Sequence, residues 1–294
     1  MDAQDLINAT RRRMKAGVAT EDQLNVLAQP YSPGDDTLSF TYPMQGLQPG
    51  TRMSASLNQY HLWAVSANNK TATVTGGMDG APDLPLTAGT LVRVRPRWTD
   101  FEILDDLNND LSDLSGHGLY QVLTTEVTFN AAVNGYDLGN LQVIHVLGVF
   151  YQTPGPYKNW PRIDHWELRR NADTTDFPSG LALQVNGFAY TGRPVQVMYA
   201  SPFTPLGTDL SQDIGSTGLP LTAFDLPPYG AAIALQSGTD IERTRLDTQG
   251  DTRRSDEVQV GSPGQAVGLL RQQRQERIST ELTRLQALYP ARWH

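Results

Sequence analysis

Residues 98–118 read WTDFEILDDLNNDLSDLSGHG and separate two long stretches of short β-like runs. Thr99 and Glu102 have the spacing of a capping box, in which a threonine and a glutamate three residues later bond each other's backbone N–H groups at a helix start. Gly116 and Gly118 interrupt the pattern at its other end. The apolar residues between recur at the spacing of one helix face: Phe101, Leu104, Leu107, Leu111 and Leu114. The sequence therefore predicts a central amphipathic helix over 98–118.

The stretch before this helix has the texture of a small β region. Its apolar runs lie at 38–42, 61–65, 71–75 and 90–95, with Pro-Gly, Gly-Gly and Asp-Gly pairs between them. Strands this short and this closely spaced are typical of a small antiparallel barrel or sandwich. We predict such a region over 37–97.

The stretch after the helix has a similar texture. Several of its runs alternate polar and apolar residues, as strands with one wet face do; the runs lie at 126–129, 142–147, 165–169, 181–185 and 194–199. A β-sandwich-like region over 119–226 follows. Residues 201–228 are rich in Pro, Gly, Asp, Ser and Thr, so we expect a long loop there that becomes ordered against a partner.

Helical patterns stand at the N-terminal side of the chain. Residues 3–16 place Leu6, Ile7, Ala9 and Met14 among polar residues, with basic residues in the second half, where cations suit the helix dipole. Thr20 and Gln23 have capping-box spacing, which predicts a second short helix through Leu27. Together these patterns indicate an N-terminal helical arm over 1–36.

The C-terminal region, 227–294, is also predicted to be helical. After Pro227 and Pro228 a helix over 229–246 is expected, with a break at Ser237–Gly238, and then a polar turn over 247–256. Residues 264–289 form a long helix ended by Pro290, with a thin inner stripe: Val267, Leu270, Ile278, Leu282 and Leu285. The fold class is therefore α+β, a β-barrel or β-sandwich body with an N-terminal helix, a central amphipathic helix and long C-terminal helices.

Composition excludes several classes of function. The 294 residues carry 31 acidic and 23 basic side chains, a net charge of -8, which disfavours binding of nucleic acid through its phosphates. Three of the basic residues are lysines, and the arginine excess fits either an interface-rich protein or a GC-rich genome. There are no cysteines, so disulfide and thiolate chemistry are absent. No stretch approaches the roughly 18 apolar residues of a membrane helix, and no signal pattern opens the chain, so neither membrane insertion nor export is expected.

No catalytic or cofactor motif emerges. The histidines are scattered, and neither an esterase elbow nor a phosphate-binding loop is present. Asp106, Asn108 and Asp110 match the first ligands of a calcium loop, but Leu111 replaces the required glycine and His117 the closing glutamate. The central helix explains these residues better. We predict no catalytic, metal or cofactor-binding residues, and no enzyme activity.

Two stretches and their order carry a resemblance to a known class. The first is Trp98-Thr99-Asp100 with the leucines that follow, and the second is 229–290, where an Ala-rich helix leads to a set of charged and apolar markers: Glu242-Arg243, Arg253-Arg254, Glu257-Val258, Glu281, Leu282, Leu285 and Tyr289-Pro290. They cover about a third of the chain. This arrangement resembles the head-to-tail connector (adaptor) proteins of tailed bacteriophages. The β regions depart from the smallest adaptors, which are mostly helical.

The resemblance implies a structural neck protein of the virion, assembled in the host cytoplasm. It implies a homo-oligomeric ring, usually a dodecamer of about 12 copies, that binds the portal protein and other neck or tail proteins while genomic DNA passes through the lumen without specific binding. The C-terminal region is then the interface with the portal or a neighbour, through six side chains: Arg271, Arg274, Arg277, Arg284, Tyr289 and Trp293.

Two other classes stay open. A minor tail or tail-tip protein could bind host carbohydrate through a β-sandwich, with Tyr157, Trp160 and Trp166 stacking on sugar rings. A cell-wall hydrolase would need polar groups that converge across a cleft, which the sequence does not indicate. The fold class alone does not choose among these functions.

Overall fold

The computed structural model describes residues 1–14, 23–44, 46–133, 135–139, 141–186, 189–247 and 262–290, without the side chains of 238–247 and 262–266. Its contacts divide the chain into two compact units. The first unit comprises Met1–Asp110, Leu206–Ile214 and Asp225–Arg274, and the second comprises Leu111–Pro205, Gly215–Phe224 and Gln275–His294. Both contain helices and antiparallel strands, so the predicted α+β class is confirmed.

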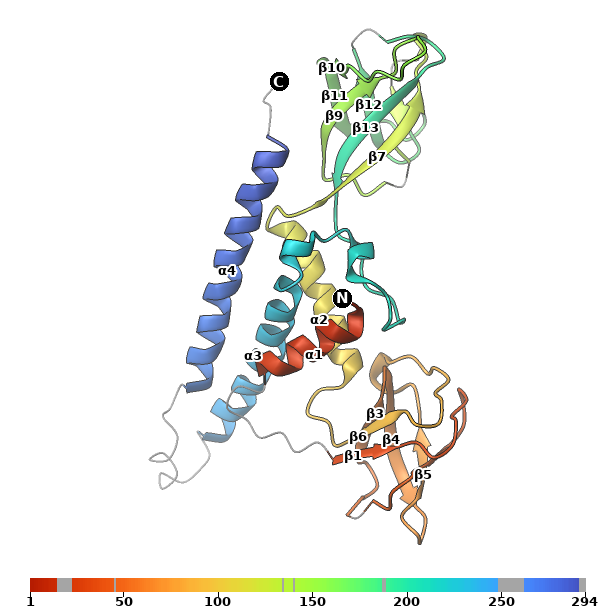
Figure 1. Cartoon of the computed structure of the whole chain (residues 1–294), viewed down its shortest axis with the longest axis vertical. Helices are drawn as coiled ribbons and strands as arrows, with labels where there is room; N and C mark the ends of the chain where they lie inside the picture. Colours follow the sequence, from red (N-terminus) through yellow and green to blue (C-terminus); the bar gives the residue numbers. More distant parts are fainter. Residues whose placement is uncertain are drawn as a thin grey trace. The chain divides into compact units, whose positions relative to one another are not determined.

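The first unit contains a curled antiparallel sheet (Figure 1). Its strand order is β1-β6-β3-β4-β5-β2, with these bounds: β1 Gln23–Val26, β2 Thr37–Ser39, β3 Arg52–Ala55, β4 Asn58–Val65, β5 Thr71–Thr75 and β6 Leu91–Val94. Just beyond the two outer strands, the N–H of Ala28 donates to Ser39 O at 2.8 Å and the N–H of Thr41 donates to Val26 O at 2.9 Å. The outer strands β1 and β2 are therefore joined to each other.

Alternation explains how this sheet forms. Along β4, Tyr60 and Leu62 belong to a hydrophobic core that includes residues of β5 and β6, and both are fully buried. The predicted strand at 71–75 is β5. Strand β3 was not predicted, because Arg52–Ala55 has few apolar residues and no clear alternation.

One prediction for the N-terminal arm is correct and one is wrong. Helix α1 spans Ala3–Met14 and buries Leu6, Ile7, Ala9 and Met14, as expected. The second helix is wrong where the structure can be compared with it, because residues 23–26 form β1; Thr20 lies outside the described residues. Pairing with β6 in register, residue by residue, outweighs the capping-box pattern.

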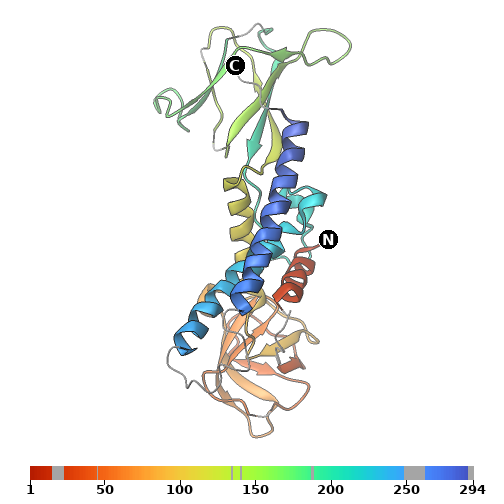
Figure 2. The ribbon, with the colours of Figure 1, turned by 90° about the vertical axis from the view of Figure 1, so that its left-hand side faces the viewer.

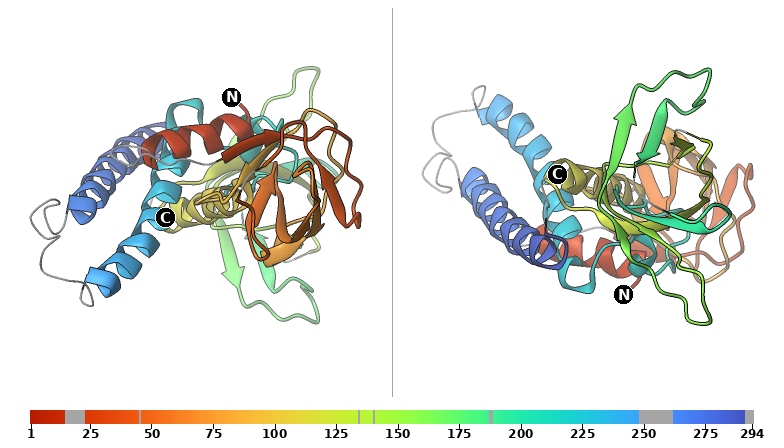
Figure 3. Two further views of the ribbon diagram at one scale, coloured as in Figure 1. Left: turned by 90° about the horizontal axis from the view of Figure 1, so that it is seen from below. Right: turned by 90° about the horizontal axis from the view of Figure 1, so that it is seen from above.

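The first unit also contains α1, α3 and parts of α2 and α4. Helix α2 spans Asp100–Gly116 and matches the predicted central helix, with Ile103, Leu107, Leu111 and Leu114 fully buried or nearly so. Helix α1 packs against α3, which spans Leu226–Asp247 (Figure 3). The division between the two units falls within α2 and within α4.

The second unit holds two antiparallel sheets. One has the order β10-β9-β13-β7 and the other β11-β12-β8; the bounds are β7 Gln121–Thr128, β8 Tyr136–Asp137, β9 His145–Tyr151, β10 Arg162–Ile163, β11 Trp166–Arg170, β12 Leu181–Val185 and β13 Pro194–Ser201. Val149 and Val197 from the first sheet and Leu183 from the second belong to a single hydrophobic core. The alternating runs in the sequence thus supply one buried face per sheet.

The segment predicted as a long loop is bonded to its own chain. It contains two 3-10 turns, η2 Ile214–Thr217 and η3 Leu221–Ala223, and a third such turn, η1 Met78–Gly80, lies in the first unit. Thr204 N–H donates to Thr217 O at 2.9 Å. We expected this loop to become ordered only against a partner, and that expectation is wrong where the segment is held by hydrogen bonds within its own chain.

The described part of the C-terminal region contains α3 and α4, the latter spanning Ser262–Leu288 (Figure 2). Pro227 and Pro228 stand in the first turn of α3, where their missing N–H groups have no helical partner anyway. The predicted break at Ser237–Gly238 is wrong, since α3 continues through it and Ser237 Oγ bonds Ile233 O at 2.7 Å. The predicted turn over 247–256 lies, from 248 on, outside the described residues.

Within the described part of the chain, no helix combines the length and the apolar character needed to cross a membrane.

Candidate functional site

Helix α4 has one side against its own chain and one side in solvent. Among its described side chains, Val267, Ile278 and Glu281 are buried, and Leu270, Leu282 and Leu285 of the predicted inner stripe are half-buried. Leu269, on the side of the helix opposite Val267, is 56% exposed, and Leu288, which continues the inner stripe near the end of the helix, is 64% exposed. The thin stripe predicted from the sequence is thus the packed side, and two large apolar side chains remain uncovered.

Arg274 already has a partner within the first unit. Its Nη2 lies 2.6 Å from Asp110 Oδ1, and the two side chains are 13% and 6% exposed. Gly230 on α3 stands directly over this pair, because a Cβ at that position would overlap the Asp110 carboxylate. The absence of a side chain at Gly230 therefore lets α3 lie against the buried ion pair.

Glu281 organises two further arginines in the second unit. Its side chain is 5% exposed, with Arg277 Nη2 at 3.4 Å and Arg284 Nη1 at 3.7 Å from its carboxylate oxygens. Thr222 Oγ1 donates to Glu281 Oε2 at 2.9 Å, and Arg277 Nη2 donates to Thr222 O at 2.6 Å. Arg284 also bonds the Thr222 hydroxyl. These bonds fix the η3 turn to α4 and leave Arg284 half exposed.

The predicted interface residues therefore differ in what they can offer a partner. Arg271 is exposed, with its Nη2 3.4 Å from Ser237 Oγ, and the Arg284 side chain is 52% exposed. Arg274 and Arg277 serve contacts within the chain. Tyr289 is half-buried, and its N–H donates to Leu285 O at 2.9 Å. Trp293 lies outside the described residues.

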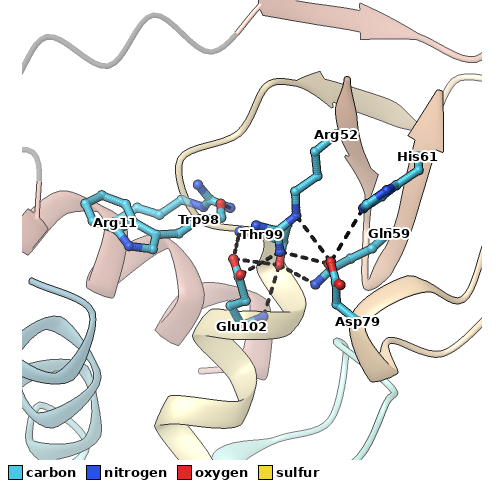
Figure 4. Close-up of polar contacts among 8 residues, drawn as sticks. All are labelled: Arg11, Arg52, Gln59, His61, Asp79, Trp98, Thr99 and Glu102. Atoms are coloured by element: carbon cyan, nitrogen blue, oxygen red, sulfur yellow. Dashed lines mark hydrogen bonds and ion pairs between the residues drawn. The ribbon is translucent and has the colours of Figure 1, made fainter. Parts of the chain in front are cut away.

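A polar cluster secures the start of α2 to the sheet (Figure 4). The capping box is confirmed, because Thr99 N–H donates to Glu102 Oε2 at 2.8 Å and Glu102 N–H donates to Thr99 Oγ1 at 3.1 Å. Gln59 of β4 donates from Nε2 to Thr99 Oγ1 at 2.7 Å, and both side chains are fully buried. The cap thus also serves as a contact between the helix and the sheet.

Arg52 lies at the centre of this cluster (Figure 4). Its Nη2 donates to Glu102 Oε1 at 2.5 Å and to Gln59 Oε1 at 2.8 Å, and its Nε lies 3.8 Å from Asp79 Oδ2. His61 Nε2 lies 3.7 Å from the same Asp79 oxygen. Arg52 lies beside the carboxylates of Glu102 and Asp79, and the Thr99 hydroxyl bonds the backbone at the helix start. The cluster is therefore suited to holding α2 against the sheet.

Arg11 forms a second polar contact at the start of α2. Its Nη2 lies 2.6 Å from Asp100 Oδ1 and 3.1 Å from Trp98 O, and it is almost buried. This contact attaches α1 to the first turn of α2, where an acidic residue also suits the helix dipole. The spacing in the sequence predicted the roles of Thr99 and Glu102, but not those of Arg11, Arg52 and Gln59, which come from elements far away in the chain.

The calcium-like residues belong to α2, as the helical interpretation expected. Asn108 accepts from Leu206 N–H at 2.8 Å and donates to Leu206 O at 3.0 Å, and Asp110 pairs with Arg274. Burial, together with the neighbouring carboxylates of Asp105 and Glu102, raises the pKa of Asp106 to about 6. Among the described residues, no three histidine or acidic side chains gather as a metal site would require.

The aromatic side chains considered for sugar binding do not share one setting. Tyr157 is 86% exposed in the β9–β10 loop, whereas Trp166 packs against the core of the second unit and Trp160 is half-buried. Thr153 N–H donates to Asn159 O at 3.0 Å and closes this loop. Of these three aromatic side chains, Tyr157 is therefore the one that is largely exposed.

No protein-family profile matches the sequence, and comparison with curated proteins gives no significant match.

Proposed function

We propose that this chain is a structural neck protein of a tailed bacteriophage, forming a ring of about 12 copies that joins the portal to the tail. The observation that carries the proposal is the set of exposed apolar and basic side chains along α4. This helix of 27 residues leaves Leu269, Arg271, Arg284 and Leu288 at the surface, although Val267, Ile278 and Glu281 of the same helix are buried.

Contact with another subunit would stabilise these side chains. Covering apolar surface contributes roughly 25 cal/mol per Å² removed from water, so Leu269 and Leu288 favour a protein neighbour. Arg271 and Arg284 can each bond a carboxylate with two parallel N–H groups, which suits charged contacts with the portal. Arg274 and Arg277 act from within the chain, by holding the helix in place.

We propose that the two β regions form the body of each ring subunit, one as a barrel and one as a sandwich. The bonds that join the ends of β1 and β2 support a closed six-stranded barrel. The core shared by the two sheets of the second unit supports a β-sandwich. Both forms bury one face of each strand and leave the other for neighbours.

The net charge of -8 supports passage of DNA without retention. Like charge removes the gain from counterion release that phosphate binding supplies. Retention of DNA by the purified chain at physiological salt would contradict this part of the proposal.

The test uses portal rings from the phage genome that encodes this chain. We expect the wild-type chain to co-sediment with them, and the variant Leu269→Glu/Arg271→Glu to lose binding while keeping its thermal unfolding temperature. Leu24→Glu is the matched control, because Leu24 is also 56% exposed but lies on β1. Equal binding by all three proteins would refute the proposal.

A carbohydrate-binding minor tail protein is the second candidate, favoured by the exposure of Tyr157. A sugar ring could stack on the Tyr157 ring, although exposed aromatic side chains more often contact other proteins. Binding to a glycan array that Tyr157→Ala abolishes would support this candidate. Portal binding without glycan binding would remove it.

A further inference from the structure

Strand β7 is a long edge strand in the second unit. It pairs with β13 over eight residues, Gln121 with Ser201 through Thr128 with Pro194, and among the described strands no other pairs with it. Figure 1 shows it at the margin of the sheet, beyond β13. The backbone N–H and C=O groups along its opposite edge therefore have no strand partner among the described residues.

Edge strands usually carry features that prevent pairing with another chain, such as lysine, proline, a bulge or short length. The sequence of β7, QVLTTEVT, has eight residues with no lysine or proline and a single charged side chain, Glu126, and its β13 pairing shows no register shift. The outer strand at the opposite edge of the sheet, β10, has two residues, and β11 in the other sheet carries Glu167, Arg169 and Arg170. Strand β7 is thus the long edge that lacks protection.

The bonds of Phe129, the residue after β7, show which groups face outward. Its N–H donates to Arg193 O at 2.9 Å, and its C=O accepts from Gly192 N–H at 2.8 Å, so both of its backbone groups face the β13 side. This direction alternates along an antiparallel strand. The N–H and C=O groups at alternate positions therefore face the open edge: Val122, Thr124, Glu126 and Thr128.

These four positions are self-complementary about a two-fold axis at Thr125. In an antiparallel pair of two β7 strands centred there, Val122 faces Thr128 and Thr124 faces Glu126 of the second copy as hydrogen-bonded pairs. On the other side of the new sheet, Leu123, which is 38% exposed, faces Val127. No glutamate then faces a glutamate, and like charges directly opposite each other would destabilise such a pair.

We propose that β7 is the dimerisation edge of the free chain, pairing antiparallel with β7 of a second copy in the register centred on Thr125. The two four-stranded sheets then form one continuous sheet across the two-fold axis. This contact is isologous, whereas the neighbours in a cyclic ring meet through two different surfaces. The dimer is accordingly a state of the chain outside the ring, in which each copy covers the other's unprotected edge.

The test is sedimentation equilibrium of the full chain over a range of concentrations. The wild type is expected to form a species of about 65 kDa, two chains of 32.3 kDa. Thr124→Pro removes an outward N–H without removing a bond to β13, so it is expected to give a folded monomer. Thr124→Val keeps the N–H group and is expected to remain dimeric.

Charge substitutions at the exposed Thr124 test the register. Thr124→Lys places a lysine opposite each Glu126 and is expected to lower the dimer Kd by roughly two- to thirtyfold, and Thr124→Glu to raise it by a similar factor. A register centred on Thr124 would instead place lysine opposite lysine and weaken the dimer.

A wild type that stays monomeric, or a Thr124→Pro protein that dimerises as well as the wild type, would overturn the proposal. Changes of the dimer Kd in the same direction for Thr124→Lys and Thr124→Glu would overturn the register. Circular dichroism of each variant checks that it has folded.

Discussion

Arg274 and Asp110 form an ion pair with an N–O distance of 2.6 Å, and both side chains are largely shielded from water. The pair links α4 to α2 within the first unit. An ion pair in this setting stabilises little over an apolar contact, but removing one partner leaves a charge in a site that water reaches poorly. The pair therefore makes the position of this part of α4 sensitive to single substitutions.

Arg274→Ala is expected to lower the free energy of unfolding by about 3 kcal/mol, because the Asp110 carboxylate loses its 2.6 Å partner. Arg271→Ala is the control on the same helix, with an expected change within about 0.5 kcal/mol, since Arg271 is exposed. Urea denaturation followed by circular dichroism measures both. Equal effects would show that the buried pair does not stabilise the chain.

Gly230→Ala and Gly268→Ala are expected to act in opposite directions. A methyl group at 230 overlaps the Asp110 carboxylate, so this variant loses more than about 1 kcal/mol although alanine favours a helix. At 268 a methyl group meets no atom within 4 Å, so this variant gains about 0.5–1 kcal/mol. Thermal unfolding of the two proteins beside the wild type gives the comparison. Stabilisation by both alanines would contradict the close approach of α3 to α2.

Thr99→Ala is expected to cost about 2 kcal/mol, of which about 1 comes from the lost cap and the rest from the buried Gln59 amide left without its acceptor. Thr99→Ser retains the hydroxyl group and should recover most of this loss. Chemical denaturation of both variants distinguishes the contribution of the Thr99 hydroxyl group to stability from that of its methyl group. A serine variant as unstable as the alanine variant would indicate that packing, and not the cap, matters at this position.

Asp106→Asn is expected to be more stable than the wild type above pH 7 and equal to it near pH 4. Burial raises the pKa of Asp106 from 3.8 to about 6, so the folded chain holds this proton more tightly than the unfolded chain does. The resulting stability is fully present below pH 3.8 and is lost as the pH rises through about 6. The difference at pH 8 should be about 1 kcal/mol or less, because solvent screens this half-exposed group. Unfolding measured from pH 4 to 8 follows it, and a constant difference would contradict the shift.

Several parts of the fold could be predicted because their signals are local. The period of the leucines and the Thr99–Glu102 spacing locate α2, and alternation locates β5 and β12 at the predicted residues. The polar strand β3 and the partners of Arg52 depend on residues brought together by the sheet, which no local pattern records. Residues 23–26 show the same limit, since a capping pattern gave way to pairing with β6.

The candidate site could be predicted only in outline. The stripe of Val267, Ile278 and their neighbours gave the packed side of α4. The spacing of the arginines did not reveal that Arg274 pairs with Asp110, or that Glu281 is buried between Arg277 and Arg284. Charged residues on a helix look alike in sequence, whether they meet solvent, their own chain or another subunit.

The central claim is that this chain assembles as a ring on the portal. Its most direct test is the mass of the complex formed with portal rings, measured by native mass spectrometry and compared with negative-stain images. The account predicts an added mass of about 390 kDa, corresponding to about 12 chains of 32.3 kDa arranged as a closed ring. Portal rings that gain no mass when the folded chain is in excess would contradict it.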